Sequence, residues 1–179
     1  CVMIVRVNVA STAGGRRHAR RLALARLISI AGSMAAGIAL AAVLWQRTGS
    51  AAWVAAGALS TSLVAGTITP LTGSLADRFD RRRLMIGSDI AAAVAFGVLA
   101  LLVALDAPPI VLVMTAAVGA ICESPFVPAS RAALPNLVDD NDLPWANGLL
   151  GQVSGLSFAV GPLVGGALTG LLSGSVAMA

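Results

Sequence analysis

The sequence contains no lysine and no tyrosine, only one histidine and two cysteines, and 11% of its 179 residues are charged. A soluble domain carries charges on about a quarter of its residues, so this chain has too little polar surface to cover a globule in water. Apolar residues are abundant: 58% of the residues are hydrophobic, and the mean hydropathy is +0.89. This composition indicates an exterior that faces lipid, because apolar side chains can then point outward.

The same scarcity argues against soluble chemistry. Cys1 and Cys122 are far apart in the sequence and in different surroundings, so they suggest neither a disulfide framework nor the spacing of metal ligands. His18 lies in an arginine-rich segment, where we expect a solvated side chain rather than a ligand or a base. The sequence has no P-loop to bind phosphates, so an ATP-driven pump would need another chain. We therefore predict no enzymatic activity, no cofactor and no metal site.

The basic residues behind the net charge of +4 and the isoelectric point near 11.0 are all arginine. Ten of the twelve lie at or before Arg26 or between Arg78 and Arg83. A nucleic-acid-binding protein would spread them over a face with polar and aromatic groups between them. Here they mark the ends of apolar runs, as the positive-inside bias of membrane proteins requires. We therefore expect no nucleic-acid partner.

Five apolar runs are long enough to cross a bilayer, which takes about 20 residues of helix. The runs are continuous, whereas the strands of a membrane barrel alternate over about ten residues. A helix also satisfies its backbone hydrogen bonds within one segment, as hydrocarbon demands. We therefore predict an all-α membrane protein with spans at about residues 22–45, 51–75, 84–105, 110–127 and 143–172.

The two ends of the chain differ from these spans. Residues 1–21 are basic, and we expect them to form a poorly ordered cytoplasmic tail. Residues 172–179 stay apolar after a Ser-Gly-Ser turn, as if a sixth span began there. Many transporters are built from repeated bundles of spans, with the substrate site between the repeats. Residues 22–179 are therefore interpreted as an N-terminal transmembrane bundle, most of one half of such a protein.

The placement of arginine predicts which side of the membrane each connection occupies. The turns at residues 46–50 and 106–109 hold one arginine between them and should face outward. Arg131 lies in the long polar loop expected at residues 128–142, which is cytoplasmic by counting. The cytoplasmic side also takes the N-terminal arginines (Arg16, Arg17, Arg20, Arg21) and those after the second span (Arg78, Arg81, Arg82, Arg83). We expect a multi-pass protein of the inner cell membrane with a cytoplasmic N-terminus.

A charged turn, GSLADRFDRRR at residues 73–83, separates the second and third spans. It resembles the loop signature of the major facilitator superfamily, and the resemblance extends over most of the chain. Residues 128–150 resemble the connection between the fourth and fifth helices of the drug- and siderophore-exporter branch, which includes macrolide-efflux-like and enterobactin-exporter-like members. The positions of the turn that carry the resemblance are Gly73, Asp77, Arg78, Arg81 and Arg82.

In that family such a loop is thought to latch the two halves in one access state, so the resemblance implies a gating role, with a partner in a second half. The alternative is a plain positive-inside anchor, which four arginines would supply without Asp77 or Gly73. The residue order, and not the charge alone, favours gating. Asp80 stands where the family usually has glycine, although an aspartate also suits a turn.

The fifth span carries a pattern of small residues. Ser157, Gly161 and Gly165 are four residues apart and share one helix stripe, which lets another helix approach closely. Pro162 removes a backbone hydrogen bond and can bend the helix. The resemblance implies an antiporter-associated signature, in which Ser157 stands where glycine is usual. Such a signature implies export rather than uptake. The alternative is ordinary packing of small residues. The matching positions are Gly148, Ser157, Gly161, Pro162, Gly165 and Gly166.

Charged residues inside spans are candidates for function because burying them is costly. Glu123 lies near the cytoplasmic end of the fourth span and is a candidate for proton coupling or cation recognition; the alternative is a place at headgroup level near Arg131. For Asp89 we expect a structural ion pair with the cluster at residues 81–83. Arg26 is close enough to the start of the first span for its side chain to reach the interface.

The resemblance implies a secondary active transporter that exports small amphipathic molecules, such as drugs or siderophores, by alternating access coupled to protons. Its partners would be the lipid bilayer, the substrate, protons and a missing C-terminal half. Relatives often carry an acidic residue in the first span, near the position of Ser33. This chain lacks it, which argues against any specific proton relay. The alternative is a truncated or non-transporting membrane component that needs a second half or a partner. We expect the stripe of small residues to be exposed in this chain alone, which also suggests that a partner covers it.

Overall fold

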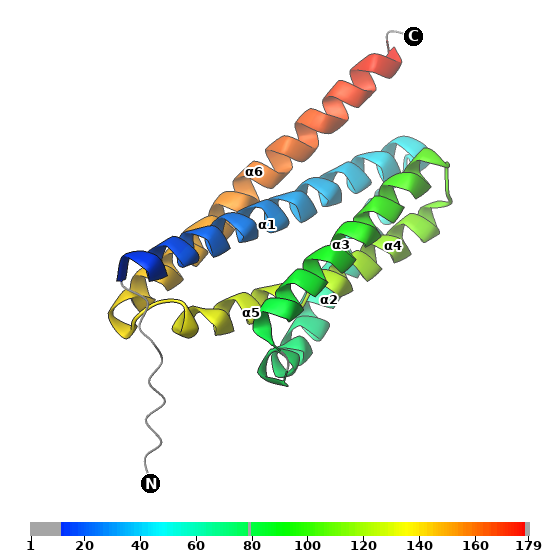
Figure 1. Ribbon diagram of the computed structural model, residues 1–179. Helices are drawn as coiled ribbons and strands as arrows, with labels where there is room; N and C mark the ends of the chain where they lie inside the picture. The colour runs from blue at the N-terminus through cyan, green and yellow to red at the C-terminus, as the bar shows by residue number, and fades with distance from the viewer. Residues whose placement is uncertain (1–11, 79, 178–179) are drawn as a thin grey trace.

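The structure is a computed structural model of the chain, and it describes residues 12–78 and 80–177. Within those ranges, the side chains at residues 12–13, 69–71, 73–78 and 171–177 are outside the description. Every regular element in the described ranges is a helix (Figure 1). The elements are α1 (Thr12–Thr48), α2 (Ala51–Arg78), α3 (Arg81–Ala104), α4 (Pro109–Glu123), α5 (Phe126–Ala133) and α6 (Leu143–Ala177), with 3-10 turns η1 (Leu134–Asn136) and η2 (Asp140–Asp142).

Five helical segments in the described part of the chain are long and apolar enough to cross a membrane. They contain α1, α2, α3, α4 with α5, and α6, so the predicted all-α class, with five helices able to span a membrane, is confirmed. The exterior has the character expected of a surface in lipid. Large apolar side chains point outward along every one of these segments, with Ile28 and Leu163 both more than 70% exposed.

Three boundaries differ from the sequence-based expectation. The first helix begins at Thr12, so residues 12–21 are helical rather than a poorly ordered tail. The last helix continues to Ala177 through the Ser-Gly-Ser segment, so within the described residues no new span begins there. The expected polar loop at residues 128–142 contains α5 and two 3-10 turns, because the chain breaks at Ser124 and Pro125 and then resumes helical turns.

Local chemistry fixes several helix ends. Gly49 directly follows α1, and its φ of 61° is the left-handed conformation that glycine adopts without strain. Asp80 caps α3 by accepting a hydrogen bond from the backbone N–H of Arg83 at 2.9 Å. Pro109 opens α4. Its missing N–H costs nothing there, because the N–H groups in the first turn of a helix have no partner within the helix.

The helices form two groups that meet along α1. In Figure 1, α1 and α6 lie side by side, and α2, α3 and α4 form the second group. One apolar cluster joins α1 to the start of α6 and comprises Ala19, Ala23, Leu134, Val138, Ala146 and Leu150. A second cluster joins the other end of α1 to α3 and α4 and comprises Leu40, Leu44, Leu99, Leu112, Val113 and Ala116.

The stripe of small residues on α6 is covered by α1 rather than exposed. A Cβ added to Gly165 would lie 2.7 Å from the carbonyl oxygen of Ala35, and one added to Gly161 would collide with Met34. Ser157 is fully buried, and its hydroxyl lies 2.8 Å from the carbonyl of Val153 in its own helix. The predicted close approach of a second helix is therefore confirmed, and this helix is part of the same chain.

The charged connections gather at opposite ends of the helices, as the arginine pattern predicts. At one end, Arg81 donates from Nη1 to the carbonyl of Ala132 at 2.7 Å, which ties the start of α3 to α5. The same end holds the start of α1 and the connection from α5 to α6. At the other end, Arg47 pairs with Asp106 at 2.9 Å and joins the α1–α2 turn to the α3–α4 turn.

Candidate functional site

A cavity of about 710 Å³ lies between the two groups of helices, and Leu40, Leu44, Leu99 and Ala116 of the second apolar cluster form part of its wall. Residues of α1, α2, α3, α4, α5 and α6 all contribute to its wall. Most of the wall is apolar, and its larger side chains include Ile30, Met34, Leu40, Val54, Phe96 and Phe158. The polar groups are few: three charged residues (Arg26, Glu123 and Arg131) and the hydroxyls of Ser33, Thr61, Ser62, Ser124 and Ser154. An apolar wall with a few placed polar groups is the usual make-up of a small-molecule site.

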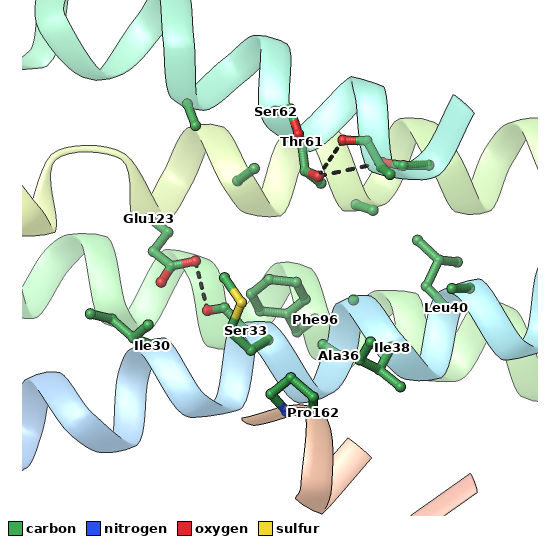
Figure 2. A pocket seen from close by; sticks show the side chains of 18 of the residues that line it. Ile30, Ser33, Ala36, Ile38, Leu40, Thr61, Ser62, Phe96, Glu123 and Pro162 are labelled. Carbon is green, nitrogen blue, oxygen red and sulfur yellow. Dashed lines mark hydrogen bonds between the residues drawn. The ribbon is translucent and has the colours of Figure 1, made fainter. Parts of the chain in front are cut away.

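Glu123, the last residue of α4, points into this cavity toward α1 (Figure 2). The hydroxyl of Ser33 donates to Oε2 of Glu123 across 2.7 Å. The same hydroxyl lies 3.1 Å from the backbone carbonyl of Ser29, one turn earlier on α1. Glu123 and Arg131 both line the cavity, and no ion pair joins them in the part of the chain that the structure describes. The coupling role of Glu123 stays a prediction.

Asp89 is held by α1 as well. Its Oδ1 accepts a hydrogen bond from the hydroxyl of Ser29 at 2.9 Å. The expected ion pair with the arginines at residues 81–83 is wrong: those side chains lie at the start of α3, and in the described residues none comes within ion-pair distance of Asp89. Ser29 and Ser33 therefore place two carboxylates, from α3 and α4, against adjacent turns of one helix.

Arg26 is buried rather than stretched to the interface. It is 2% exposed, and it donates from Nη1 to Ser130 at 2.7 Å and from Nε to Ser154 at 3.2 Å. The sequence carried a signal for this role, because an arginine within an apolar span is costly unless it has partners or a function. The partners themselves lie 104 and 128 residues away, beyond the reach of any local pattern.

The antiporter-type pattern on α6 divides between two faces. Ser157, Gly161 and Gly165 pack on α1, and Pro162 lines the cavity (Figure 2). A Cβ added at Gly148 or Gly166 would meet nothing within 4 Å, so these two glycines face open space. The structure therefore assigns close packing to three of the six positions and cavity lining to a fourth.

The turn between α2 and α3 is described in part. Gly73, Asp77 and Arg78 are helical residues of α2, but their side chains lie outside the described residues, as does Phe79. Arg81 contacts the carbonyl of Ala132, and Arg82 is exposed. Asp80, where the resembling family usually has glycine, is the N-cap of α3. An aspartate thus closes the turn by a hydrogen bond instead of by backbone freedom.

A clamp at the start of α1 escaped the sequence reasoning. Asp142 directly precedes α6, and its two carboxylate oxygens accept hydrogen bonds from Nη2 and Nε of Arg16 at 2.8 and 3.1 Å. The guanidinium groups of Arg16 and Arg20 also lie over the ring of Trp145, at 5.5 and 5.9 Å from its centre. These contacts tie the first turns of α1 to the start of α6.

No group of three or more histidine, cysteine, aspartate or glutamate side chains in the described residues is arranged to hold a metal ion. Within the same residues, Cys122 is a free thiol. The chemistry that the cavity offers is therefore that of carboxylates, hydroxyls and guanidinium groups in apolar surroundings.

Comparison with known proteins agrees with this architecture. Residues 13–179 match the Major Facilitator Superfamily. Two curated relatives, each described as macrolide efflux protein A and coming from Streptococcus pyogenes and its serotype M6, are 30% identical over 138 residues. The match covers 76% of this chain and 34% of each relative, so the chain spans about a third of their length. No solved structure gives a significant match. With five helices able to cross a bilayer, the chain is a multi-pass membrane protein and belongs to the Major Facilitator Superfamily.

Proposed function

We propose that this protein is a secondary active transporter that exports small amphipathic molecules, such as drugs, in exchange for protons. Membership of the superfamily supports transport, and the printed name of the relatives supports efflux of macrolides or compounds like them. The cavity of about 710 Å³ and its mostly apolar wall suit an amphipathic guest of that kind. Siderophores remain a second substrate class of the same chemistry.

The observation that carries the proton-coupling proposal is the hydrogen bond between Ser33 and Glu123 inside the cavity. A serine hydroxyl has one hydrogen, and here two acceptors lie within its reach: Glu123 and the carbonyl of Ser29. When Glu123 is ionised, Ser33 donates to it. When Glu123 is protonated, Ser33 can donate to Ser29 and accept the proton of Glu123. The site can therefore hold both protonation states without moving a helix.

The substrate would exchange with that proton because both occupy the same cavity. An ionised Glu123 facing apolar side chains has lost much of its hydration, which is costly. A proton or a cationic substrate group would relieve that cost, and each would weaken the binding of the other. Such competition is the thermodynamic basis of antiport: the two ligands act on one site in opposite directions.

Alternating access requires a second bundle, which would rock against this one around the cavity. We place that bundle opposite α1, α2 and α4, and we assign the gating contact to the α2–α3 turn at Gly73, Asp77, Arg78, Arg81 and Arg82. The turn and the start of α1 would face the cytoplasm in the cell membrane, because they hold most of the arginines. Replacing Asp77 by asparagine would then reduce efflux and leave membrane insertion intact.

Transport in inverted membrane vesicles tests the proposal. Vesicles containing the full-length protein should accumulate a macrolide when a proton gradient is applied and release it when the gradient is collapsed. Glu123→Gln should abolish this accumulation, because the amide cannot take up a proton. Asp140→Asn is the matched control, since Asp140 is exposed in η2, away from the cavity. Accumulation by Glu123→Gln at the wild-type level would reject the coupling role of Glu123.

A further inference from the structure

Arg26 and Arg131 face two cavities in common. Both line the large cavity described above, and both line a smaller one of about 210 Å³ that Asn147, Leu150 and Gly151 complete. The smaller cavity lies between α1, α5 and α6, at the end of the molecule where the other arginines gather. It contains two guanidinium groups and no carboxylate.

The guanidinium of Arg26 is bonded only to neutral groups. Its Nε and Nη1 donate to the hydroxyls of Ser154 and Ser130, and its Nη2 has no hydrogen-bond partner among the described residues. The residue is 2% exposed. A buried charge normally has a counter-charge, because hydroxyl dipoles replace only part of the hydration that the charge has lost.

Arg131 adds a second charge of the same sign. Arg131 is exposed, and it lines both cavities together with Arg26. The ion pairs in the described residues join Arg16 to Asp142 and Arg47 to Asp106, so neither arginine of the cavity is neutralised by them. Glu123 lines the large cavity but not the small one, and its partner is Ser33. The place between the two guanidinium groups therefore lacks a negative charge.

We propose that an anionic group, a carboxylate or a phosphate, binds between Arg26 and Arg131, with the apolar part of the same molecule in the large cavity. Guanidinium groups recognise both anions through paired N–H donors in one plane. Ile30, Met34 and Phe158 continue the wall from Arg26 with apolar surface, which suits an amphiphile with an acidic head. This inference goes beyond the proposed function, because the binding needs no proton gradient and no turnover.

Isothermal titration calorimetry with the full-length protein in a non-ionic detergent tests this site. Dihexanoyl phosphatidylglycerol, an anionic amphiphile, should bind with saturation, and zwitterionic dihexanoyl phosphatidylcholine should bind far more weakly. Arg131→Gln should weaken the anionic lipid about tenfold or more, the usual effect of losing a hydrogen bond between charged groups. Arg21→Gln removes the same charge from an exposed position on α1 outside both cavities and should leave the affinity unchanged.

Competition experiments identify the source of the anion. Displacement of the lipid by inorganic phosphate alone supports a free-anion ligand, displacement by octanoate supports a carboxylate amphiphile, and resistance to both supports a lipid headgroup. Equal binding of the two lipids, an unchanged affinity in Arg131→Gln, or an equal loss in Arg21→Gln would each overturn the proposal. Thermal unfolding of every variant verifies its fold. If Arg131→Gln does not fold, Arg131→Lys replaces it, because it keeps the charge but loses the planar donors and should still bind the anionic lipid more weakly.

Discussion

The hydroxyl of Ser33 lies 2.7 Å from a carboxylate oxygen of Glu123 and 3.1 Å from the backbone carbonyl of Ser29. It joins α1 to the end of α4 at the wall of the central cavity. One hydrogen shared between two acceptors allows Ser33 to act as a donor toward an ionised Glu123 and as an acceptor from a protonated one. The coupling role proposed for Glu123 therefore depends on this serine.

Replacing Ser33 by alanine should lower proton-driven transport about 10- to 150-fold, since a hydrogen bond to a charged group contributes about 1.5–3 kcal/mol. Ser33→Thr keeps the hydroxyl and should retain most of the activity. The measurement is the initial rate of substrate accumulation in inverted vesicles under a fixed proton gradient. If alanine and threonine variants transport equally well, the hydroxyl has no part in coupling.

The packing of α6 on α1 gives a prediction about stability. Gly165→Ala would place a methyl group 2.7 Å from the carbonyl oxygen of Ala35, so the helices must separate. Overpacking of this kind costs about 1–3 kcal/mol. Gly166→Ala is the matched control, because its methyl group meets nothing within 4 Å and alanine favours a helix by about 1 kcal/mol over glycine.

Thermal unfolding in detergent measures both glycine variants. Gly165→Ala should unfold at a lower temperature than the wild type, and Gly166→Ala at the same temperature or a higher one. Equal shifts in the two variants would show that α6 does not approach α1 as closely as the structure has it.

The cap of α3 gives a prediction at a position where the chain departs from its family. Asp80→Ala removes the acceptor for the N–H of Arg83 and should destabilise the protein by about 1 kcal/mol. Asp80→Gly, which installs the residue usual in the family, should cost only a few tenths of a kcal/mol, since glycine is itself a good N-cap. Chemical denaturation in mixed micelles can rank the three proteins. A glycine variant less stable than the alanine variant would contradict the capping role.

The clamp between Arg16 and Asp142 should protect the start of α6. Asp142→Asn removes the charge that holds both Nε and Nη2 of Arg16. The backbone amides in the first turns of α1 and α6 should then exchange hydrogen faster, as measured by mass spectrometry. Asp140→Asn, two residues earlier and exposed, is the control. Unaltered exchange in Asp142→Asn would mean that apolar packing alone holds these turns.

The spans could be predicted because each is a continuous apolar run, and lipid imposes that pattern on every helix that crosses it. The separation of the connections could be predicted from the arginines, and Arg47 and Arg81 do lie at opposite ends of the helices. Which of these ends faces the cytoplasm stays a prediction. The stripe on α6 could be predicted as a contact surface, because residues four apart share a helix face. The helix that packs against this stripe could not be predicted, since nothing in residues 143–172 indicates which helix lies opposite.

The pairings of charged side chains were beyond sequence reasoning. Asp89 was expected to contact the nearby arginines, but the fold brings Ser29, 60 residues away, to its carboxylate. Arg26 was expected at the interface, but α5 and α6 bring two serines over it. Asp142 pairs with Arg16, 126 residues away. Charge shows that a side chain needs partners, and only the packing of helices decides which.

Competition between substrate and proton at Glu123 is tested most directly by measuring proton release when the substrate binds. The purified full-length protein, in detergent and weakly buffered solution, should release protons when a macrolide is added, because substrate and proton compete at Glu123. The Glu123→Gln variant should release none, and the Asp140→Asn control should release as many as the wild type. Proton release of wild-type size from Glu123→Gln would contradict the assignment of Glu123 as the coupling carboxylate.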